Sequence, residues 1–470
     1  MTPARPIDTI CAIATPLGIG AVGVVRVSGP DALSVVETIF APRRRGGPSP
    51  TLADAPSHTV HHGWMTDPAT GEPVDEVLVT LMRAPRSYTC EETVEISGHG
   101  GPMVLARILE LCLSAGARLA EPGEFTKRAF LNGRLDLTQA EAVMALIHAE
   151  SETAHRLALR QLRGDVADAV RAIRTSLLEL LGQCEASLDF VEQGVAAPPS
   201  EHVRLQLDAI RRRLDVLVQS AQAGERLRDG VQTVIIGRPN VGKSSLFNRL
   251  LRKERAIVTP FPGTTRDLLQ EMLLINNVPI RLIDTAGIRT SPDPIEREGI
   301  QRARRSTDEA DLVLLVLDGS QPLQQDDWML LDAINTNNTI IIFNKIDVCA
   351  PMDFTAVAGR HQTTSIVPLS ASTGAGCEEL LAQISRWLTE RLGGSVERPM
   401  ISSSRQEQAL TAAMHAITNA QGAAANGMPA ECLACDLNDA IRQLGGLLGV
   451  DGDFTEELLD NIFSQFCIGK

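Results

Sequence analysis

The 470-residue sequence is poor in aromatic residues, has no disulfide framework and contains no long apolar run. Aromatic side chains make up 3% of the chain, so we do not expect an aromatic stacking platform for single-stranded nucleic acid. The 9 cysteines are an odd number without framework spacing, as is typical of a reducing compartment. No apolar run approaches the roughly 20 residues of a membrane span, and no signal-peptide pattern opens the chain. These absences predict a cytoplasmic protein without a membrane segment.

The charge and the spacing of possible metal ligands argue against two further classes of protein, nonspecific nucleic-acid coats and zinc-binding proteins. The net charge of −14 argues against a nonspecific coat of nucleic acid, although a local basic groove remains compatible with it. We interpret the arginine runs at 43–45 and 211–213 as solvated surface. A lone C-x-x-C pair and a histidine cluster in a loop-like segment are weak zinc signals without a second ligand pair. These residues are Cys432, Cys435, His58, His61 and His62.

A complete G-x-x-x-x-G-K-S phosphate-binding loop stands at residues 237–244. An apolar stretch that is typical of a buried strand precedes it, and a helical pattern follows, which is the context that the motif requires. Its glycines let backbone N–H groups approach phosphate oxygens, and the helix N-terminus adds partial positive charge. We expect Lys243 to reach the β- and γ-phosphates and Ser244 to hold Mg²⁺. The alternative is a chance glycine loop before a helix.

The downstream motifs follow the order of a guanine-nucleotide domain. An apolar strand at 278–283 is followed by Asp284, Thr285, Ala286 and Gly287. An Asp at the end of a strand suits the Mg²⁺ shell, and the Gly amide suits the γ-phosphate. After a further apolar strand comes N-K-x-D, whose last carboxylate, Asp347, can accept two hydrogen bonds from guanine but not from adenine. Ser370 and Ala371 fit the loop whose backbone contacts the guanine O6. The sequence therefore predicts GTP binding.

Two positions bear on switching and hydrolysis. Thr265 is expected to close on Mg²⁺ when the γ-phosphate is present, and the alternative is an ordinary polar turn. Ile288 stands where Ras-like GTPases carry a glutamine that orients the attacking water. An isoleucine side chain cannot bond water, so another group must position the nucleophile. Glu296 is the nearby candidate, and the alternative is a solvated charge in a loop.

The patterning divides the chain into four segments. Residues 1–122 predict an α/β domain, with strands at 10–14, 23–27, 76–82 and 93–97. Residues 123–225 predict long amphipathic helices, 226–392 a Ras-like P-loop G domain, and 393–470 a helical tail. If the tail packs with the earlier helices, the G domain is inserted into a helical domain. The fold class is thus α/β plus all-α.

Nearly the whole chain resembles the MnmE (TrmE) family of tRNA-modifying GTPases. The resemblance rests on residues 14–16, 20–29, 97–101 and 122–137. Its most specific part is the C-terminal sequence F-C-I-G-K at 466–470, which is separate from the GTPase motifs. The resemblance implies that the N-terminal α/β domain is a tetrahydrofolate-binding and dimerisation domain.

The family resemblance also implies a reaction and partners. It implies a homodimer that forms a heterotetramer with the flavoprotein MnmG (GidA). Together they would install a carboxymethylaminomethyl or aminomethyl group on the wobble uridine of certain tRNAs. The one-carbon unit would come from a 5,10-methylene or 5-formyl tetrahydrofolate. The G domains would pair across their nucleotide faces, with K⁺ acting where other GTPases use an arginine finger.

Site residues follow from matching the family motifs. The resemblance implies folate contacts at Arg26, Glu95, Arg134 and Lys470. Arg134 often corresponds to a lysine in the family, and arginine keeps the charge but not the point geometry. Arg26 has the alternative of a structural cation at a strand end. Glu296 matches the catalytic glutamate, which acts through water beside Lys243. The implied K⁺ ligands are Asn240, Thr259, Phe261 and Thr264.

The C-terminal cysteine, Cys467, matches a family cysteine near the folate. A thiolate could attack a pyrimidine ring, and the alternative is a buried or positioning cysteine. The motifs and the resemblance together give an expected GTP site. Its residues are Asn240, Val241, Gly242, Lys243, Ser244, Ser245, Thr259, Pro260, Phe261, Pro262, Gly263, Thr264, Thr265, Asp284, Thr285, Ala286, Gly287, Asn344, Lys345, Asp347, Ser370 and Ala371.

Two other function classes remain open at this point. One is a ribosome-assembly GTPase of the Era or Der type, which shares the GTPase motifs but carries a KH-type RNA module or tandem G domains. The sequence shows one G domain and no KH-like G-x-x-G context. The other is a folate-binding scaffold that uses GTP only for assembly.

Overall fold

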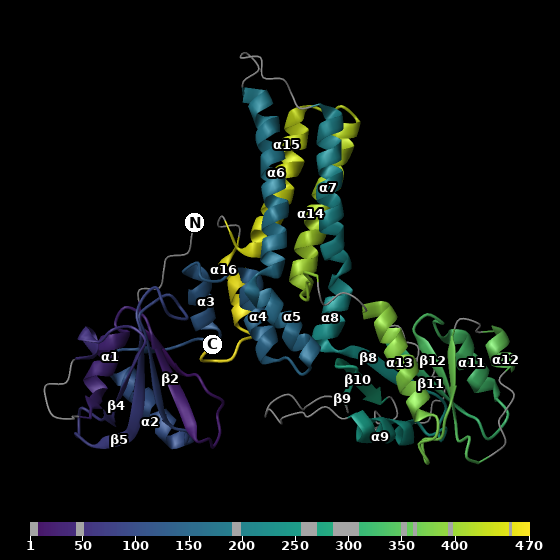
Figure 1. The fold of residues 1–470 in the computed structure, drawn as a ribbon, viewed down its shortest axis with the longest axis horizontal. Helices are drawn as coiled ribbons and strands as arrows, with labels where there is room; N and C mark the ends of the chain where they lie inside the picture. The colour runs from purple at the N-terminus through teal and green to yellow at the C-terminus, as the bar shows by residue number, and fades with distance from the viewer. Residues whose placement is uncertain are drawn as a thin grey trace. The chain divides into compact units, whose positions relative to one another are not determined.

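The computed structural model describes residues 8–43, 51–189, 199–254, 270–284, 310–348, 355–360, 364–392, 398–450 and 454–470. The chain divides into two compact units, each built from segments distant in the sequence (Figure 1). The first comprises Met1–Met144, Val170–Ala197 and Pro429–Lys470, and the second comprises Ala145–Ala169 and Pro198–Met428. This division into two units does not test the domain boundaries predicted at 122, 225 and 392, which stay predictions.

A seven-stranded sheet with strand order β3-β4-β5-β6-β2-β1-β7 forms the centre of the first unit. Buried and part-exposed positions alternate along the central strands, and the buried set forms one core with two helices. The face that carries Arg26 and Glu95 lies opposite that core. The elements are β1 (Ile10–Ile13), β2 (Val22–Ser28), α1 (Ala32–Ile39), β3 (Phe40–Pro42), a 3₁₀ turn (Leu52–Asp54), β4 (Thr59–Thr66), β5 (Pro73–Met82), β6 (Thr93–His99), α2 (Pro102–Ser114) and β7 (Arg118–Leu119).

The prediction of strands at 10–14, 23–27, 76–82 and 93–97 is confirmed by β1, β2, β5 and β6. The interpretation of the histidine segment as a loop is wrong, because His61 and His62 lie on β4, paired with β5. His62 lies 2.9 Å from a Glu76 carboxylate oxygen, and His61 lies 2.8 Å from the Thr59 hydroxyl. Among the described residues, no group of three or more His, Cys, Asp or Glu side chains could hold a metal ion.

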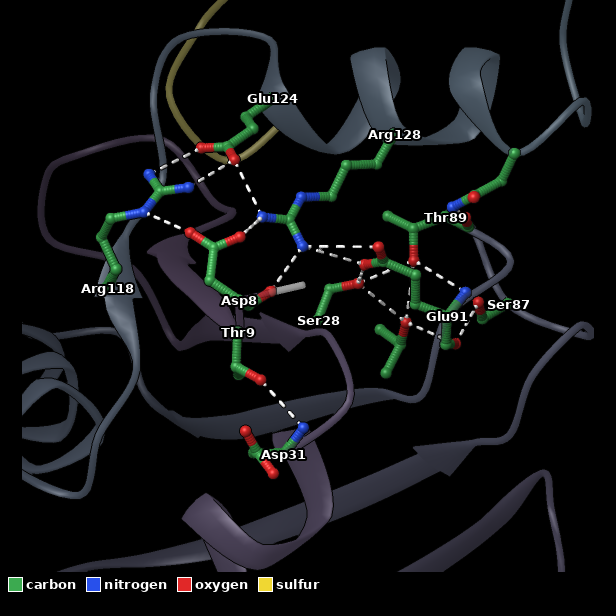
Figure 2. Close-up of polar contacts among 12 residues, drawn as sticks. Asp8, Thr9, Ser28, Asp31, Ser87, Thr89, Glu91, Arg118, Glu124 and Arg128 are labelled. Atoms are coloured by element: carbon green, nitrogen blue, oxygen red, sulfur yellow. Dashed lines mark hydrogen bonds and ion pairs between the residues drawn. The ribbon is translucent and has the colours of Figure 1, made fainter. Parts of the chain in front are cut away.

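Helix α3 (Glu124–Leu131) is fixed to this sheet by Arg128, whose side chain is completely buried (Figure 2). Its Nη1 donates to the Asp8 carbonyl at 2.8 Å and to the Glu91 carboxylate at 3.3 Å. Its Nη2 donates to the Asp8 carboxylate at 2.8 Å and to Glu124 at 3.0 Å. Arg118 bridges the same two carboxylates from β7, at 2.7 Å each.

The network continues into the segment between β5 and β6. The Ser28 hydroxyl lies 2.7 Å from both Glu91 and the Thr89 hydroxyl. Asn132, just after α3, donates to the Thr89 carbonyl at 2.7 Å. Residues 83–92 are therefore held between the sheet and α3.

Four more helices contribute all or most of their residues to the first unit. Lys127 of α3 donates to Asp460 of α16 at 2.7 Å, which ties the C-terminal segment to α3. The helices are α4 (Leu137–Ile147), α6 (Asp165–Asp189), α15 (Ala430–Leu448) and α16 (Glu456–Phe463).

The second unit contains a six-stranded sheet in the order β13-β12-β11-β8-β10-β9, in which only the edge pair β9–β10 is antiparallel. Every residue of the central strand β11 is buried, as expected for a parallel strand covered on both faces. The elements are β8 (Val231–Ile236), α9 (Lys243–Glu254), β9 (Gln270–Ile275), β10 (Val278–Asp284), β11 (Leu312–Asp318), α11 (Gln325–Ala333), β12 (Thr339–Asn344), α12 (Thr355–Arg360), β13 (Ser365–Pro368) and α13 (Cys377–Leu392).

Four helices complete this unit: α5 (Glu152–Arg163), α7 (Ser200–Gln219), α8 (Ala221–Asp229) and α14 (Ser404–Ala425). Helices α7 and α14 pack along one another (Figure 1). The expectation that the tail packs with the earlier helices is confirmed for this pair. Among the described residues, we find no helix with the length and apolar character needed to cross a membrane.

Replacing Arg128 with methionine keeps much of the side-chain volume but leaves three carboxylates without their shared cation. We expect the first unit to lose about 3–5 kcal/mol of unfolding free energy, the usual cost of removing one partner from a buried ion pair. Urea unfolding should be followed by Trp64 fluorescence, with Trp328 and Trp387 replaced by phenylalanine. Arg107→Met, which removes half-exposed ion pairs to Asp67 and Glu110, should cost less than about 1 kcal/mol. Equal losses would contradict the structural role of Arg128.

The same network predicts acid sensitivity. Burial raises the pKa of Asp8 and of Glu124, but hydrogen bonds and charges from Arg118 and Arg128 outweigh burial and hold each pKa below its ordinary value. The unfolded carboxyls bind protons more readily, so this stabilisation is complete above their unfolded pKa values, about 3.9 and 4.3, and is lost as the pH falls further. The urea midpoint reported by Trp64 should drop below about pH 4, and Glu124→Gln should flatten that drop. If the urea midpoint already decreases as the pH is lowered near neutrality, titratable groups other than Asp8 and Glu124 cause the acid sensitivity.

Candidate functional site

The predicted nucleotide motifs meet at one edge of the six-stranded sheet. The phosphate-binding loop follows β8, Asp284 is the last residue of β10, Asn344 is the last residue of β12, and Ser370 follows β13. These strands are parallel, so their carboxyl ends lie on the same side. Ligands of open α/β sheets bind at this edge.

The phosphate-binding loop has the backbone geometry that its sequence predicts. Asn240 and Gly242 have φ values of 65° and 100°, in the left-handed region. A Cβ at Gly242 would collide with the Asn344 side chain, so this position requires glycine. Lys243, the first residue of α9, donates to the carbonyls of Gly237 at 2.9 Å and Arg238 at 2.6 Å. Its ammonium group therefore lies inside the loop that would surround the phosphates.

Arg238 anchors the loop from outside, a role that the sequence analysis did not identify. Its Nε donates to Asp327 at 2.7 Å, and Nη1 donates to Gln324 at 2.5 Å. Asp327 is fully buried and also caps the N-terminus of α11 through the Gln324 amide. The loop is thereby fixed to the next helix of the domain.

Asn344 joins the phosphate end of the site to the base end. Its Nδ2 donates to the Val241 carbonyl at 2.8 Å, and its Oδ1 accepts from the Ala371 amide at 2.9 Å. The side chain is buried. One amide group thus satisfies two loops that are far apart in the sequence.

The adjacent Lys345 is held by Asp318 at the end of β11, with an Nζ–Oδ2 distance of 2.7 Å. Burial raises the pKa of Asp318, but hydrogen bonds from Lys345, Ser320 and Gln321 prevail and lower it to about 2. Asp318 therefore remains a carboxylate at all physiological pH values, and it orients the aliphatic part of Lys345 at the base end of the site.

Asp347 lies exposed beside the 370–372 loop. The Ser372 hydroxyl donates to its Oδ2 at 2.9 Å, and hydrogen bonds from Ser370 and Ser372 lower its pKa. Arg249 of α9 donates to the Ala371 carbonyl at 3.0 Å. The carboxylate is thus ionised and available as a double acceptor, which is the property that guanine recognition requires.

Several predicted residues lie outside the described part of the chain. They are Thr259, Pro260, Phe261, Pro262, Gly263, Thr264, Thr265, Thr285, Ala286, Gly287 and Glu296. For Asp284 only the backbone at the end of β10 is described. Of the expected ion ligands, Ser244 lies at the start of α9 and Asn240 lies in the loop before it.

The predicted folate residues lie in the first unit, and the structure brings them to one place. Arg26 and Glu95 are directly opposite in the β2–β6 register, and both Nε and Nη2 of Arg26 lie within 2.9 Å of Glu95 Oε1. The Arg26 guanidinium also lies 3.4 Å from the Gly469 carbonyl and 5.2 Å from the centre of the Tyr88 ring.

The C-terminal segment completes this cluster. The Phe125 amide donates to the Lys470 carbonyl at 3.1 Å, and a Cβ at Gly469, whose φ is 97°, would collide with the Ile13 carbonyl. The last residues therefore lie closely on β1 and α3. Burial, together with the Arg26 charge, lowers the pKa of Lys470. Cys467 is a free, exposed cysteine in the same segment.

Tyr88 is a site residue that the sequence analysis missed. Arg134 donates to the Tyr88 carbonyl at 2.7 Å and lies 4.8 Å from its ring centre, while the ring hydroxyl lies 2.9 Å from the Thr126 hydroxyl. Tyr88 thus connects Arg134 to Arg26. It is the only tyrosine in the chain, which is the one signal that could have singled it out.

The donor set of this cluster fits a ligand with carboxylates and a ring that both donates and accepts hydrogen bonds. Arg26, Arg134 and Lys470 supply positive charge, and Glu95 supplies an acceptor between them. Arg–carboxylate pairs are well suited to such recognition. The cluster therefore suits a folate, with its glutamate carboxylates and its pterin ring.

Comparisons with known proteins cover the whole chain. The family described as "GTP-binding protein TrmE N-terminus" matches residues 9–134, and "MnmE helical domain" matches residues 137–467. A tRNA modification GTPase MnmE from Carboxydothermus hydrogenoformans is 43% identical over 464 residues, covering 98% of this chain and 99% of the relative. The MnmE of Levilactobacillus brevis is 42% identical over 465 residues, covering 98% of each protein.

Solved structures match part of the chain. The G domain of the T. maritima iron transporter FeoB is 30% identical, covers 33% of this chain and 98% of that one, and has a TM-score of 0.26. The Aquifex aeolicus Era structure with GDP and AlF4⁻ is 28% identical, covers 40% and 66%, and has a TM-score of 0.27. The family matches, in contrast, run through both compact units. The chain belongs to the MnmE (TrmE) family of tRNA modification GTPases.

Proposed function

We propose that this protein is a K⁺-stimulated GTPase that acts with a flavoprotein partner of the MnmG (GidA) type on the wobble uridine of tRNAs. It would help to add a carboxymethylaminomethyl or aminomethyl group, using a one-carbon unit from 5,10-methylene or 5-formyl tetrahydrofolate. Family membership supports the coarser statement, a GTP hydrolase in tRNA modification. The docking of the C-terminal F-C-I-G-K segment beside Arg26 and Glu95 is the observation that carries the folate part.

In the G domain, water would attack the γ-phosphorus while the bond to the β-phosphate oxygen breaks, giving GDP and phosphate. Lys243 would hold the β- and γ-phosphate oxygens from within its loop, and Asp347 would select guanine. Glu296 would orient the attacking water through a second water molecule. Mg²⁺ near Ser244 and Thr265, and K⁺ near Asn240, Thr259, Phe261 and Thr264, would supply positive charge to the phosphates when bound.

In the first unit, the resident residues would bind and orient the folate. Arg26 is already fixed by Glu95 and by the Gly469 carbonyl, so little rotamer entropy remains to be lost on binding. Lys470 and Arg134 would hold carboxylates. Cys467 is exposed in the same segment, and we assign it a positioning or reactive role near the folate.

A homodimer through the N-terminal domain is part of the proposal. The sheet face that carries Arg26 also exposes several large apolar side chains, and such exposed apolar groups on a charged protein are typical of an interface. These side chains are Val22, Val60, Trp64 and Leu78. A second copy of this face would cover them. We propose a cytoplasmic heterotetramer of this dimer with two flavoprotein subunits.

The Era or Der alternative is not favoured, because the family matches extend over the N-terminal and helical regions that those proteins do not share. A folate-binding scaffold that uses GTP only for assembly remains testable. Slow GTP turnover that is uncoupled from tRNA modification would favour it.

Replacing Asp347 with asparagine should change the base specificity of the G domain. The carboxylate can accept from both N1–H and the amino group of guanine, and losing a charged acceptor should weaken GTP binding about 100-fold. Xanthine carries an oxo group where guanine carries the amino group, so the asparagine amide should favour XTP. Competition binding with fluorescent nucleotides measures the affinities for GTP and for XTP. Ser372→Ala keeps the carboxylate and should lose less than about tenfold. Unchanged guanine preference in Asp347→Asn would exclude this residue from base recognition.

Nucleoside mass spectrometry of tRNA tests the proposed reaction. Cells lacking the protein should lose the modified wobble uridine, the wild-type gene should restore it, and neither Lys243→Ala nor Arg26→Ala should do so. An unchanged nucleoside profile in cells without a second copy of the gene would overturn the tRNA assignment. Equal GTP turnover in Na⁺ and K⁺ buffers would remove K⁺ from the proposal but leave the reaction.

A further inference from the structure

A cavity of about 500 Å³ opens beside the folate cluster, on the side of Tyr88 that faces Arg134. This volume lies within the range of small-molecule sites, about 300–1,000 Å³. Its walls come from the end of β5, the segment that follows it and the turn after α3. The lining residues are His58, Met82, Pro85, Arg86, Ser87, Tyr88, Cys90, Asn132, Gly133 and Arg134.

The cavity wall is basic although the protein is acidic. Two arginines and one histidine line it, and no aspartate or glutamate does, whereas the chain as a whole carries a net charge of −14. Among the described residues, neither Arg86 nor Arg134 forms an ion pair with a carboxylate. The two acids of the same segment are engaged elsewhere: Glu91 bonds Ser28 and Arg128, and Glu92 pairs with Arg83 at 3.6 Å. The positive charge in the cavity is therefore uncompensated.

The wall is also held in place before any ligand arrives. Asn132 is bonded to the Thr89 carbonyl, Arg134 to the Tyr88 carbonyl, and Ser87 to the Glu91 carbonyl at 2.6 Å. Because Arg134 and the wall around it are already held, the ordering cost of binding an anion there is low. Tyr88 lines the cavity and also contacts Arg26. The extended part of a ligand bound at Arg26 would therefore enter the cavity if it followed the Tyr88 ring.

We propose that this cavity binds the γ-linked glutamyl tail of a reduced folate, so that the protein prefers folates with several glutamates to the monoglutamate. The inference rests on the proposed folate site at Arg26, Glu95 and Lys470. Each added glutamyl residue contributes one carboxylate, which suits a cavity lined by two arginines and no acidic residue. Arg86 is the specificity-determining residue, because it lines the cavity and takes no part in the Arg26 cluster.

A tRNA phosphate backbone is the competing anion. RNA backbones are bound by basic surfaces that follow the strand, whereas these two arginines line a single cavity that Tyr88 connects to Arg26. The oligocarboxylate tail therefore fits the geometry better.

The test is calorimetric titration of the full-length protein with (6S)-5-formyltetrahydrofolate that carries one, three or five glutamates. We expect the five-glutamate form to bind about tenfold more tightly than the monoglutamate, as two partly exposed ion pairs would provide. The gain should shrink as salt is raised, because exposed charges are screened. Arg86→Ala should bring the ratio of the two affinities close to one. Arg43→Ala, an exposed arginine paired with Glu76, should keep the full ratio.

The outcomes separate this inference from the proposed function. If no form binds, both fail. If all three forms bind equally to the wild-type protein, the folate site stands and the tail site is overturned. A ratio that survives Arg86→Ala would place the tail elsewhere and overturn the assignment. If Arg86→Ala weakens tRNA binding and leaves the ratio unchanged, the cavity belongs to RNA and the inference is overturned.

Discussion

The buried guanidinium of Arg128 is the interaction on which the first unit depends. A charge that is removed from water costs several kcal/mol unless it has oppositely charged partners. Here Asp8, Glu91 and Glu124 supply them from three different segments. Only one conformation of the chain brings these segments together, so the network specifies where α3 and the segment before β6 lie. Tyr88 is in that segment and Phe125 is in that helix, and both contact Arg26. The cluster of predicted folate residues is therefore positioned by a buried cation that does not belong to it.

The second unit uses one buried amide for a similar purpose. Asn344 bonds the phosphate-binding loop through Val241 and the base-binding loop through Ala371. Gly242 leaves room for that amide, since any side chain there would displace it. One side chain thus contacts both the phosphate loop and the base loop directly. In both units, short polar contacts between distant segments join the parts of the site.

The sequence predicted local features well and tertiary ones poorly. The phosphate loop, N-K-x-D and the central strands could be predicted because their signals are contiguous or periodic. Arg128 could not, because Glu124 and Arg128 at i and i+4 look like an ordinary exposed helix pair, and only the fold buries them. The role of Arg238 likewise depends on its contacts with α11. The role of Tyr88 depends on Arg134, in the turn after α3. Strand β4 was missed because its histidines and Gly63 weaken the β-strand pattern in the sequence. In the structure this strand is stabilised by its pairing with β5.

The C-terminal lysine shows how the folate cluster is prepared for an anion. Burial and the neighbouring Arg26 both disfavour the charged form of Lys470, and its pKa is lowered although Glu95 and Cys467 act in the other direction. A carboxylate placed beside Lys470 would reverse this balance, because an opposite charge at short range favours protonation. Anion binding and protonation of Lys470 therefore strengthen each other. A bound anion would therefore offset the repulsion between Lys470 and Arg26.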